Sequence, residues 1–143
     1  MTAAAVVRLA RRGQSVLDVG CGSGVLGILA ARLGATTVTG VDIADAAVEA
    51  TLDNARRNGV AVDASTAPVG DVAGPYDLVL ANLLAPTIIE LAEHLRRLVG
   101  PDGALVVSGV LADRHDHVVE ALAPLEMVRT DVLDGWAAVE LRA

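Results

Sequence analysis

The sequence predicts an α/β fold: a seven-stranded, mostly parallel sheet with helices on both faces and an antiparallel hairpin at the C-terminus. Three observations support this prediction. Short apolar runs without a wet face alternate with helix-period segments between residues 15 and 123, as parallel βα units require. A glycine-rich turn joins the first run to an apolar helix. The last two runs, 125–132 and 137–141, flank a tight turn.

The amino-terminal half is predicted to alternate helices with buried strands. Glycines at 13, 34 and 59 follow the helical segments, where a left-handed residue commonly ends a helix. Ser23 stands just before the second helix, where its hydroxyl can cap an unpaired N–H. The expected elements are a helix over 3–12, a strand over 15–19, a helix over 24–33, a strand over 37–41, a helix over 44–57 and a strand over 60–64.

The carboxyl-terminal half continues the alternation after a loop over 65–75. One helix is expected to begin at Pro86 and to carry an apolar stripe as far as Leu98. In the last strand, apolar residues alternate with Ala138, Glu140 and Arg142, which predicts one buried and one solvent-facing side. The remaining expected elements are strands over 76–81, 104–108, 125–132 and 137–141 and a helix over 113–123.

Composition and charge narrow the class of protein. Apolar residues make up 53% of the chain and charged residues 20%, which predicts one ordered domain over 1–143. The net charge of −7 argues against a broad phosphate-binding surface, so we expect no direct binding of nucleic acid. No apolar run approaches the ~20 residues of a membrane helix, and no signal peptide is recognisable. These features predict a cytoplasmic protein without membrane association.

Neither the cysteine nor the histidines predict chemistry of their own. Cys21 is the single cysteine, which excludes an internal disulfide. No base lies near it in sequence, so we expect a small residue packed beneath a ligand rather than a nucleophile. His115 and His117 stand two apart on a predicted helix and point to different faces, so no metal site is expected.

The glycine loop indicates a nucleotide-like ligand but does not name it. Glycines at 20, 22 and 24 allow a ligand to approach the backbone, and the following helix offers free N–H groups. The run from Gly22 to Gly27 also fits the dinucleotide pattern G-x-G-x-x-G. Asp18, two residues before the first glycine, repels a pyrophosphate but suits an ammonium group or a sulfonium-bearing amino acid.

Two further polar residues stand at predicted strand tips. Asp42 ends the second strand, where a carboxylate can accept both hydroxyls of an adenosine ribose, although it also fits a helix cap. Asn82 ends the fourth strand, where its amide oxygen and nearby backbone carbonyls can accept hydrogen bonds from a substrate amine. An asparagine that forms a turn is the alternative interpretation.

Several longer segments together point to one family. They are 16–27, 41–43, 54–59, 76–84, 103–109 and 135–136, and the most specific parts are the Asn-Leu-Leu tip and the Gly-Trp turn. These segments resemble the PrmA family, whose members methylate lysine side chains and the N-terminal amine of a large-subunit ribosomal protein. The resemblance extends over nearly the whole chain.

The resemblance implies the Rossmann-like class I methyltransferase fold, S-adenosylmethionine as cofactor and a protein substrate such as a ribosomal protein. It implies that Asn82 is the catalytic residue that faces the amine and that Ser65 lies near the adenine. The implied cofactor-binding residues are Asp18, Gly20, Cys21, Gly22, Ser23, Gly24, Asp42, Ile43, Ser65 and Asn82.

The sequence departs from related patterns at two places. Family members carry an N-terminal domain that docks the substrate and a Gly/Thr-rich segment of which Thr2 is the last remnant here, so we expect a truncated or stand-alone catalytic core. Methyltransferases that act on nucleic-acid bases carry Asn/Asp-Pro-Pro and an aromatic ring at the fourth strand tip. The run Asn82-Leu83-Leu84-Ala85 lacks both, so a planar base is a poor fit.

The expected reaction is in-line transfer of a methyl group from a sulfonium to an amine nitrogen, which depends on placing the reactants and needs no covalent enzyme intermediate. Three other functions remain open. They are a small-molecule O- or N-methyltransferase, an NAD(P)-dependent oxidoreductase and a non-catalytic module that keeps the cofactor site.

Overall fold

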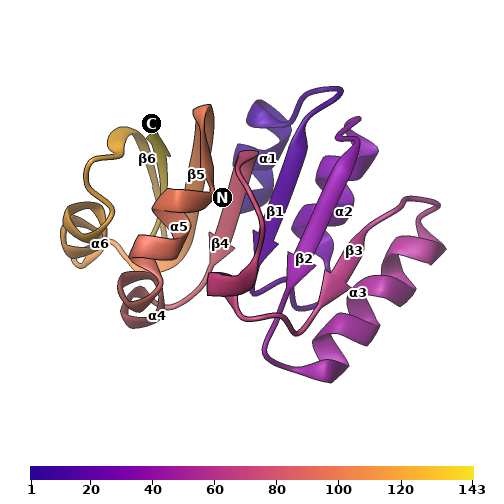
Figure 1. Cartoon of the computed structure of the whole chain (residues 1–143). Helices are drawn as coiled ribbons and strands as arrows, with labels where there is room; N and C mark the ends of the chain where they lie inside the picture. Colours follow the sequence, from indigo (N-terminus) through magenta and orange to yellow (C-terminus); the bar gives the residue numbers. More distant parts are fainter.

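The computed structural model describes all 143 residues and contains one seven-stranded sheet in the order β3-β2-β1-β4-β5-β7-β6 (Figure 1). In this order, neighbouring strands pair in parallel from β3 as far as β5, whereas β7 pairs antiparallel with both β5 and β6. The predicted fold class is therefore confirmed. The strands are β1 Ser15–Val19, β2 Thr37–Val41, β3 Asp63–Ser65, β4 Tyr76–Asn82, β5 Val99–Leu111, β6 Glu126–Leu133 and β7 Trp136–Arg142.

Helices cover both faces of the sheet, because successive residues of each strand point to opposite sides. On β1, Val16 belongs to a core shared with α1 and α2, whereas Leu17 belongs to the core under α4, α5 and α6. Central strands are thus apolar on both sides. The helices are α1 Thr2–Leu9, α2 Val25–Arg32, α3 Asp45–Arg57, α4 Ala85–Glu90, α5 Ala92–Leu98 and α6 His115–Ala121, with a 3-10 turn, η1, at Val69–Asp71.

The single helix predicted from Pro86 to Leu98 is two helices, α4 and α5, separated at Leu91. Leu91 has φ −88° and ψ 1°, outside the regular helical range. Both halves pack on β5, but their other partners differ: α4 also contacts α6, whereas α5 contacts β4 and η1. Ile88 of α4 and Leu95 of α5 are both fully buried in the same core, so the predicted apolar stripe is kept across the break.

Two strands differ in extent from the prediction. The strand predicted over 60–64 is β3, Asp63–Ser65, because the N–H of Val60 still closes the end of α3 on the carbonyl of Ala55 at 3.1 Å. Strand β5 extends beyond the predicted 104–108 at both ends, because β4 and β7 offer it further partners. Both differences arise from pairing in three dimensions.

The prediction that Ser23 caps the second helix is wrong. The residue before α2 is Gly24, with φ 85°, and it makes no side-chain cap. The carbonyl of Ser23 instead accepts a hydrogen bond from the Asn54 side chain at 2.9 Å. The carboxylate of Asp18, which comes from β1, accepts the N–H of Gly27 in the first turn of α2 at 3.2 Å. The side chain that accepts a hydrogen bond from the first turn of α2 is therefore Asp18 of β1, and not Ser23 as the sequence predicted.

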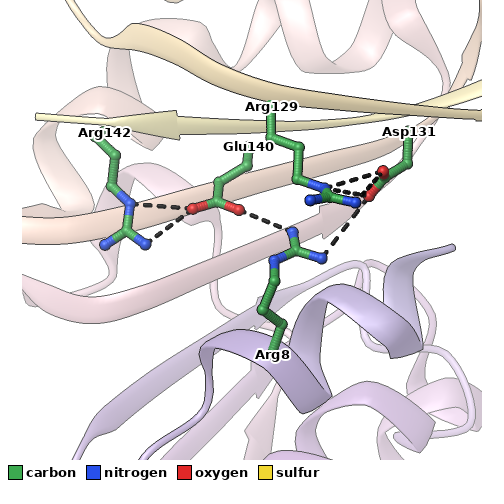
Figure 2. A network of polar contacts seen from close by, with 5 residues as sticks. All are labelled: Arg8, Arg129, Asp131, Glu140 and Arg142. Carbon is green, nitrogen blue, oxygen red and sulfur yellow. Dashed lines mark hydrogen bonds and ion pairs between the residues drawn. The ribbon is translucent and has the colours of Figure 1, made fainter.

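The prediction of a solvent-facing side on the last strand is also wrong. Ala138 and Glu140 of β7 are only 4% and 6% exposed. Helix α1 reaches this face, and its Arg8 donates a hydrogen bond to Glu140 at 2.8 Å (Figure 2). Arg142 donates to the other carboxylate oxygen at 2.8 Å, so the buried charge is neutralised from both sides. An alternating pattern cannot distinguish water from a basic residue on a covering helix.

Candidate functional site

The glycine loop after β1 forms the tight turn that the sequence predicts. Gly20, Gly22 and Gly24 have φ values of 74°, 54° and 85°, which glycine adopts without a steric penalty. The N–H groups of Gly20 and Cys21 both donate to the carbonyl of Val41, at 2.8 and 3.0 Å. The loop is therefore anchored on the end of β2.

Asp18 lies beneath the loop with only 2% of its surface exposed. Burial raises the pKa of Asp18 to about 6, the charge of Asp42 adds to the rise, and the hydrogen bond from Gly27 opposes it. An ionised Asp18 is therefore costly unless a cation lies nearby. This environment favours a ligand that brings a positive charge to the loop.

Asp42 connects the tip of β2 to the loop and to the start of α3. Its Oδ2 accepts the N–H of Gly22 at 3.0 Å, and its Oδ1 accepts the N–H of Ala44 at 3.0 Å. A carboxylate oxygen has more than one lone pair, so each of these oxygens retains acceptor capacity for a ligand hydroxyl. Asp42 thus has both a structural and a potential binding role.

Cys21 and Ser23 join the loop to α3. Cys21 is buried, its Sγ accepts a hydrogen bond from the Thr51 hydroxyl at 3.3 Å, and burial raises the pKa of its thiol. The reactive thiolate is therefore disfavoured. Ser23 contributes its backbone carbonyl to Asn54, as described above. Neither residue lines the cavity that opens beside the loop.

This cavity has a volume of about 520 Å³, within the ~300–1,000 Å³ typical of small-ligand sites. Of the ten residues expected to bind the cofactor, three line it: Gly20, Asp42 and Ile43. Asp18, Gly22, Gly24 and Asn82 do not. The other wall residues were missed, although the rule that ligands bind beyond the carboxyl ends of parallel strands points to the segments after β3 and β4. They are Val19, Val41, Thr66, Ala67, Pro68, Val69, Leu83, Thr87 and Leu91.

Ser65 lies next to the cavity but is not part of its wall. Its carbonyl accepts the N–H of Asp42 at 3.2 Å, and its Oγ accepts the N–H of Ala67 at 3.3 Å. Ser65 therefore shapes the turn that brings Thr66 and Ala67 into the wall.

The tip of β4 separates two cavities. Asn82 is exposed there, and its Oδ1 accepts a hydrogen bond from the Ser108 hydroxyl at 2.9 Å. Leu83 lines the cavity beside the glycine loop, whereas Leu84 lines a second cavity of about 630 Å³. Asn82 itself lines neither cavity, but the two residues that follow it line one cavity each. The other residues around the second cavity are Ala85, Pro86, Ile89, Gly109, Leu111, Arg114, His117, Glu120, Ala121 and Trp136.

The structure contains no group of three or more histidine, cysteine, aspartate or glutamate side chains that could hold a metal ion. None of its helices has the length and apolar character needed to span a bilayer.

Comparisons with known proteins agree on one family. The family model described as Ribosomal protein L11 methyltransferase (PrmA) matches residues 1–143. A ribosomal protein L11 methyltransferase of Methylococcus capsulatus is 46% identical over 128 residues, which cover 87% of this chain and 44% of that protein. A second, of Pseudomonas putida, is 44% identical over 133 residues, covering 91% of this chain and 46% of that protein. The chain thus spans less than half the length of these curated relatives.

Solved structures of methyltransferases share the fold of this chain. A crystal structure of a ribosomal protein L11 methylase from Lactobacillus delbrueckii subsp. bulgaricus is 30% identical with a TM-score of 0.91, covering 98% of this chain and 76% of that one. The magnesium protoporphyrin IX methyltransferase of Synechocystis, solved with bound SAH, has a TM-score of 0.77 at 21% identity, covering 99% of this chain and 80% of that one. The second likeness concerns the class I methyltransferase fold alone.

Proposed function

Because the chain belongs to the PrmA family of ribosomal protein L11 methyltransferases, we propose that it is the catalytic domain of an S-adenosylmethionine-dependent protein N-methyltransferase. The proposed acceptor is a lysine side chain or an N-terminal amine of a ribosomal protein. The proposed location of the protein is therefore the cytoplasm. The observation that carries this proposal is the place of Asn82 at the end of β4. The next residue, Leu83, lines the cavity beside the glycine loop, and Leu84 lines the cavity beside α4 and α6.

The residues around the first cavity fit S-adenosylmethionine. Gly20 has no side chain, and a Cβ built there would stand 2.5 Å from the Leu83 side chain that lines the same cavity. Asp42 in its wall offers carboxylate oxygens to the ribose hydroxyls. Asp18 is not part of the wall, but it is buried beneath the glycine loop and adds a negative charge on the side of the amino-acid moiety. Ile43 and Leu83 give apolar walls suited to an adenine. When bound, this cofactor supplies an electrophilic methyl group on a positively charged sulfur.

Asn82 is proposed to hold the acceptor amine. An amine must be neutral to attack, and a free lysine with a pKa near 10.4 is neutral in only about four of ten thousand molecules at pH 7. The Asn82 amide oxygen accepts a hydrogen bond from the neutral amine and so directs its lone pair. No covalent nucleophile is required, which agrees with the buried Cys21.

The second cavity is proposed to receive residues of the protein substrate next to the target amine. Leu84, Ile89, Leu111 and Trp136 in its wall are between 42% and 64% exposed. Such a concave apolar surface is typical of a site that binds a partner or ligand. An apolar side chain close to the amine would bury this surface and exclude water from the transfer.

The first experiment measures thermal unfolding of the chain with S-adenosylmethionine, S-adenosylhomocysteine and NAD in parallel. A ligand at one hundred times its dissociation constant adds about 2.7 kcal/mol, or a shift of several degrees. We expect a shift with both adenosyl ligands that Asp42→Ala reduces by about half or more. A shift with NAD alone, or none with any ligand, contradicts the proposed cofactor.

The second experiment measures transfer of a labelled methyl group to purified ribosomal protein L11. We expect Asn82→Ala to lower kcat by about 10²–10³, as removal of one positioned hydrogen-bonding group commonly does. The cofactor dissociation constant should change less than about twofold, because the wall of the first cavity remains intact. Equal loss of turnover and of cofactor affinity contradicts the role given to Asn82.

A further inference from the structure

Asn82 is held by a chain of two hydroxyl groups from different parts of the fold. Thr2 of α1 donates from its Oγ1 to the Oγ of Ser108 at 2.7 Å. Ser108 of β5 donates in turn to the Oδ1 of Asn82 at 2.9 Å. Two successive hydrogen bonds thus connect α1, through Ser108 of β5, to the carboxamide oxygen at the end of β4.

Ser108 is an unusual residue at its position. It is 1% exposed and follows the buried apolar run from Ala104 to Val107 in β5. A hydroxyl is costly in such surroundings unless it is hydrogen-bonded, whereas an alanine carries no such cost. Both the donor and an acceptor site of Ser108 are occupied, so its polar group is satisfied only by its contacts with Thr2 and Asn82.

The backbone beside Ser108 is shaped to the same tip. The pairing of β5 with β7 shifts register between Ser108 and Val110, which places a bulge at Gly109. Gly109 has φ 81°, and a Cβ there would stand 2.8 Å from the carbonyl oxygen of Leu83 and 3.2 Å from Asn82 Oδ1. The carbonyl of Ser108 also accepts the N–H of Leu83 at 3.0 Å. At the bulge, the backbone of β5 therefore lies close to the end of β4.

Helix α1 gives Thr2 a fixed position. Ala5 and Val6 of this helix are buried in the core over β1 and β5. Arg8 is bound to Glu140 at 2.8 Å and lies 3.8 Å from Asp131 (Figure 2). The helix is thus fixed by apolar packing and by ion pairs with β7 and β6.

From this arrangement we propose that Ser108 and Thr2 are positioning residues that orient the Asn82 carboxamide toward the acceptor amine. A serine hydroxyl rotates freely unless a neighbour fixes it. Because Thr2 donates to Ser108, the Ser108 proton is directed to Asn82 Oδ1. One lone pair of Oδ1 is then occupied and the other is held in a defined direction. This inference depends on the role of Asn82 in the proposed function.

The direct test is the mobility of the Asn82 side chain in the full chain, measured by ¹⁵N relaxation of its side-chain amide. The signal is identified by its loss in Asn82→Ala. We expect an order parameter near that of rigid backbone, about 0.85, in the unchanged protein and below about 0.6 in Ser108→Ala. Thr2→Val removes the hydroxyl at constant shape and should lower the order parameter partly. Thr2→Ser keeps the hydroxyl and is the matched control.

The kinetic test separates positioning from a structural role. We expect Ser108→Ala and Thr2→Val to lower kcat for methyl transfer to ribosomal protein L11 by about tenfold, with an unchanged cofactor dissociation constant. Thr2→Ser should restore kcat. If the Asn82 amide is already mobile in the unchanged protein, or equally rigid in Ser108→Ala, the positioning role of Ser108 and Thr2 is wrong. Absence of cofactor binding, or normal turnover in Asn82→Ala, instead contradicts the proposed function. The relaxation result then still decides whether the two hydroxyl groups hold the Asn82 side chain.

Discussion

The Oδ2 of Asp42 accepts the backbone N–H of Gly22 at 3.0 Å, so the residue at the tip of β2 also holds the glycine loop in place. Its other oxygen accepts the N–H of Ala44 at 3.0 Å. One carboxylate therefore couples the shape of the loop to the wall of the first cavity. Loss of this side chain should affect stability and ligand binding together.

Asp42→Ala should raise the dissociation constant for S-adenosylmethionine at least tenfold, because the ribose and the loop lose the same acceptor. The free energy of unfolding without ligand should fall by about 1 kcal/mol, the usual contribution of such hydrogen bonds. Calorimetric titration and urea unfolding measure the two effects. Asp102→Ala, at an exposed aspartate, is the control and should change neither quantity. Unchanged affinity in Asp42→Ala contradicts the assignment.

The raised pKa of Asp18, about 6 in the folded chain against 3.8 for the unperturbed group, has a definite effect on stability. Between these two values the folded state binds more protons than the unfolded state. The stability of the unliganded chain should therefore fall as pH rises from about 4 to about 6. Asp18→Asn lacks this titration, so the difference in unfolding free energy between the two proteins should change by on the order of 3 kcal/mol across the window.

The same group should make cofactor binding depend on pH. A cationic ligand is attracted by the ionised carboxylate, so affinity for S-adenosylmethionine should increase as pH rises through about 6. Titrations at pH 5 and pH 7.5 measure this change. Asp18→Asn should bind weakly at both values, and an affinity that is independent of pH in the unchanged protein argues against a contact between Asp18 and the ligand charge.

Glu140 should contribute stability above its unperturbed pKa of 4.5 and lose it in acid. Burial acts to raise its pKa, but hydrogen bonds from Arg8 and Arg142 outweigh burial and lower it. The folded state therefore holds fewer protons than the unfolded state near pH 4, and the contribution disappears as pH falls through the folded value. Glu140→Gln should cost about 1–3 kcal/mol at pH 7 and less at pH 3.5.

Urea unfolding at the two pH values measures this difference. The matched control is Arg56→Ala, which removes an exposed ion pair with Asp53 and should cost less than about 0.5 kcal/mol. An equal cost of Glu140→Gln at both pH values would show that the carboxylate is not held ionised by its arginines.

Gly109→Ala should be more harmful than an alanine at another glycine of similar φ. Gly13 has φ 86° with nothing within 4 Å of a built Cβ, so Gly13→Ala measures backbone strain alone, about 1–2 kcal/mol. At Gly109 the new methyl group also meets the carbonyl oxygen of Leu83 at 2.8 Å. We expect a larger loss in unfolding free energy and a lower kcat. Equal costs for the two variants would mean that the tip of β4 moves freely away from β5.

The sequence by itself was sufficient for the fold class and for the polar residues at the strand tips. Buried strands alternate with helices at regular spacing, and parallel connections bring all carboxyl ends to one edge of the sheet. Gly20, Asp42 and Asn82 could therefore be placed near one another from their positions in the chain alone. Asp18 could be recognised because its charge interrupts an apolar strand.

Only the tertiary structure decided which polar groups meet between distant segments. Thr2 and Ser108 are 106 positions apart, and Arg8 and Glu140 are 132 positions apart. The alternation in β7 predicted a wet face, but α1 covers it and supplies the countercharge. The break at Leu91 likewise depends on which surfaces α4 and α5 meet. The pattern of a segment shows that a residue is polar. Which group forms its hydrogen bond or ion pair depends on how distant segments pack against each other.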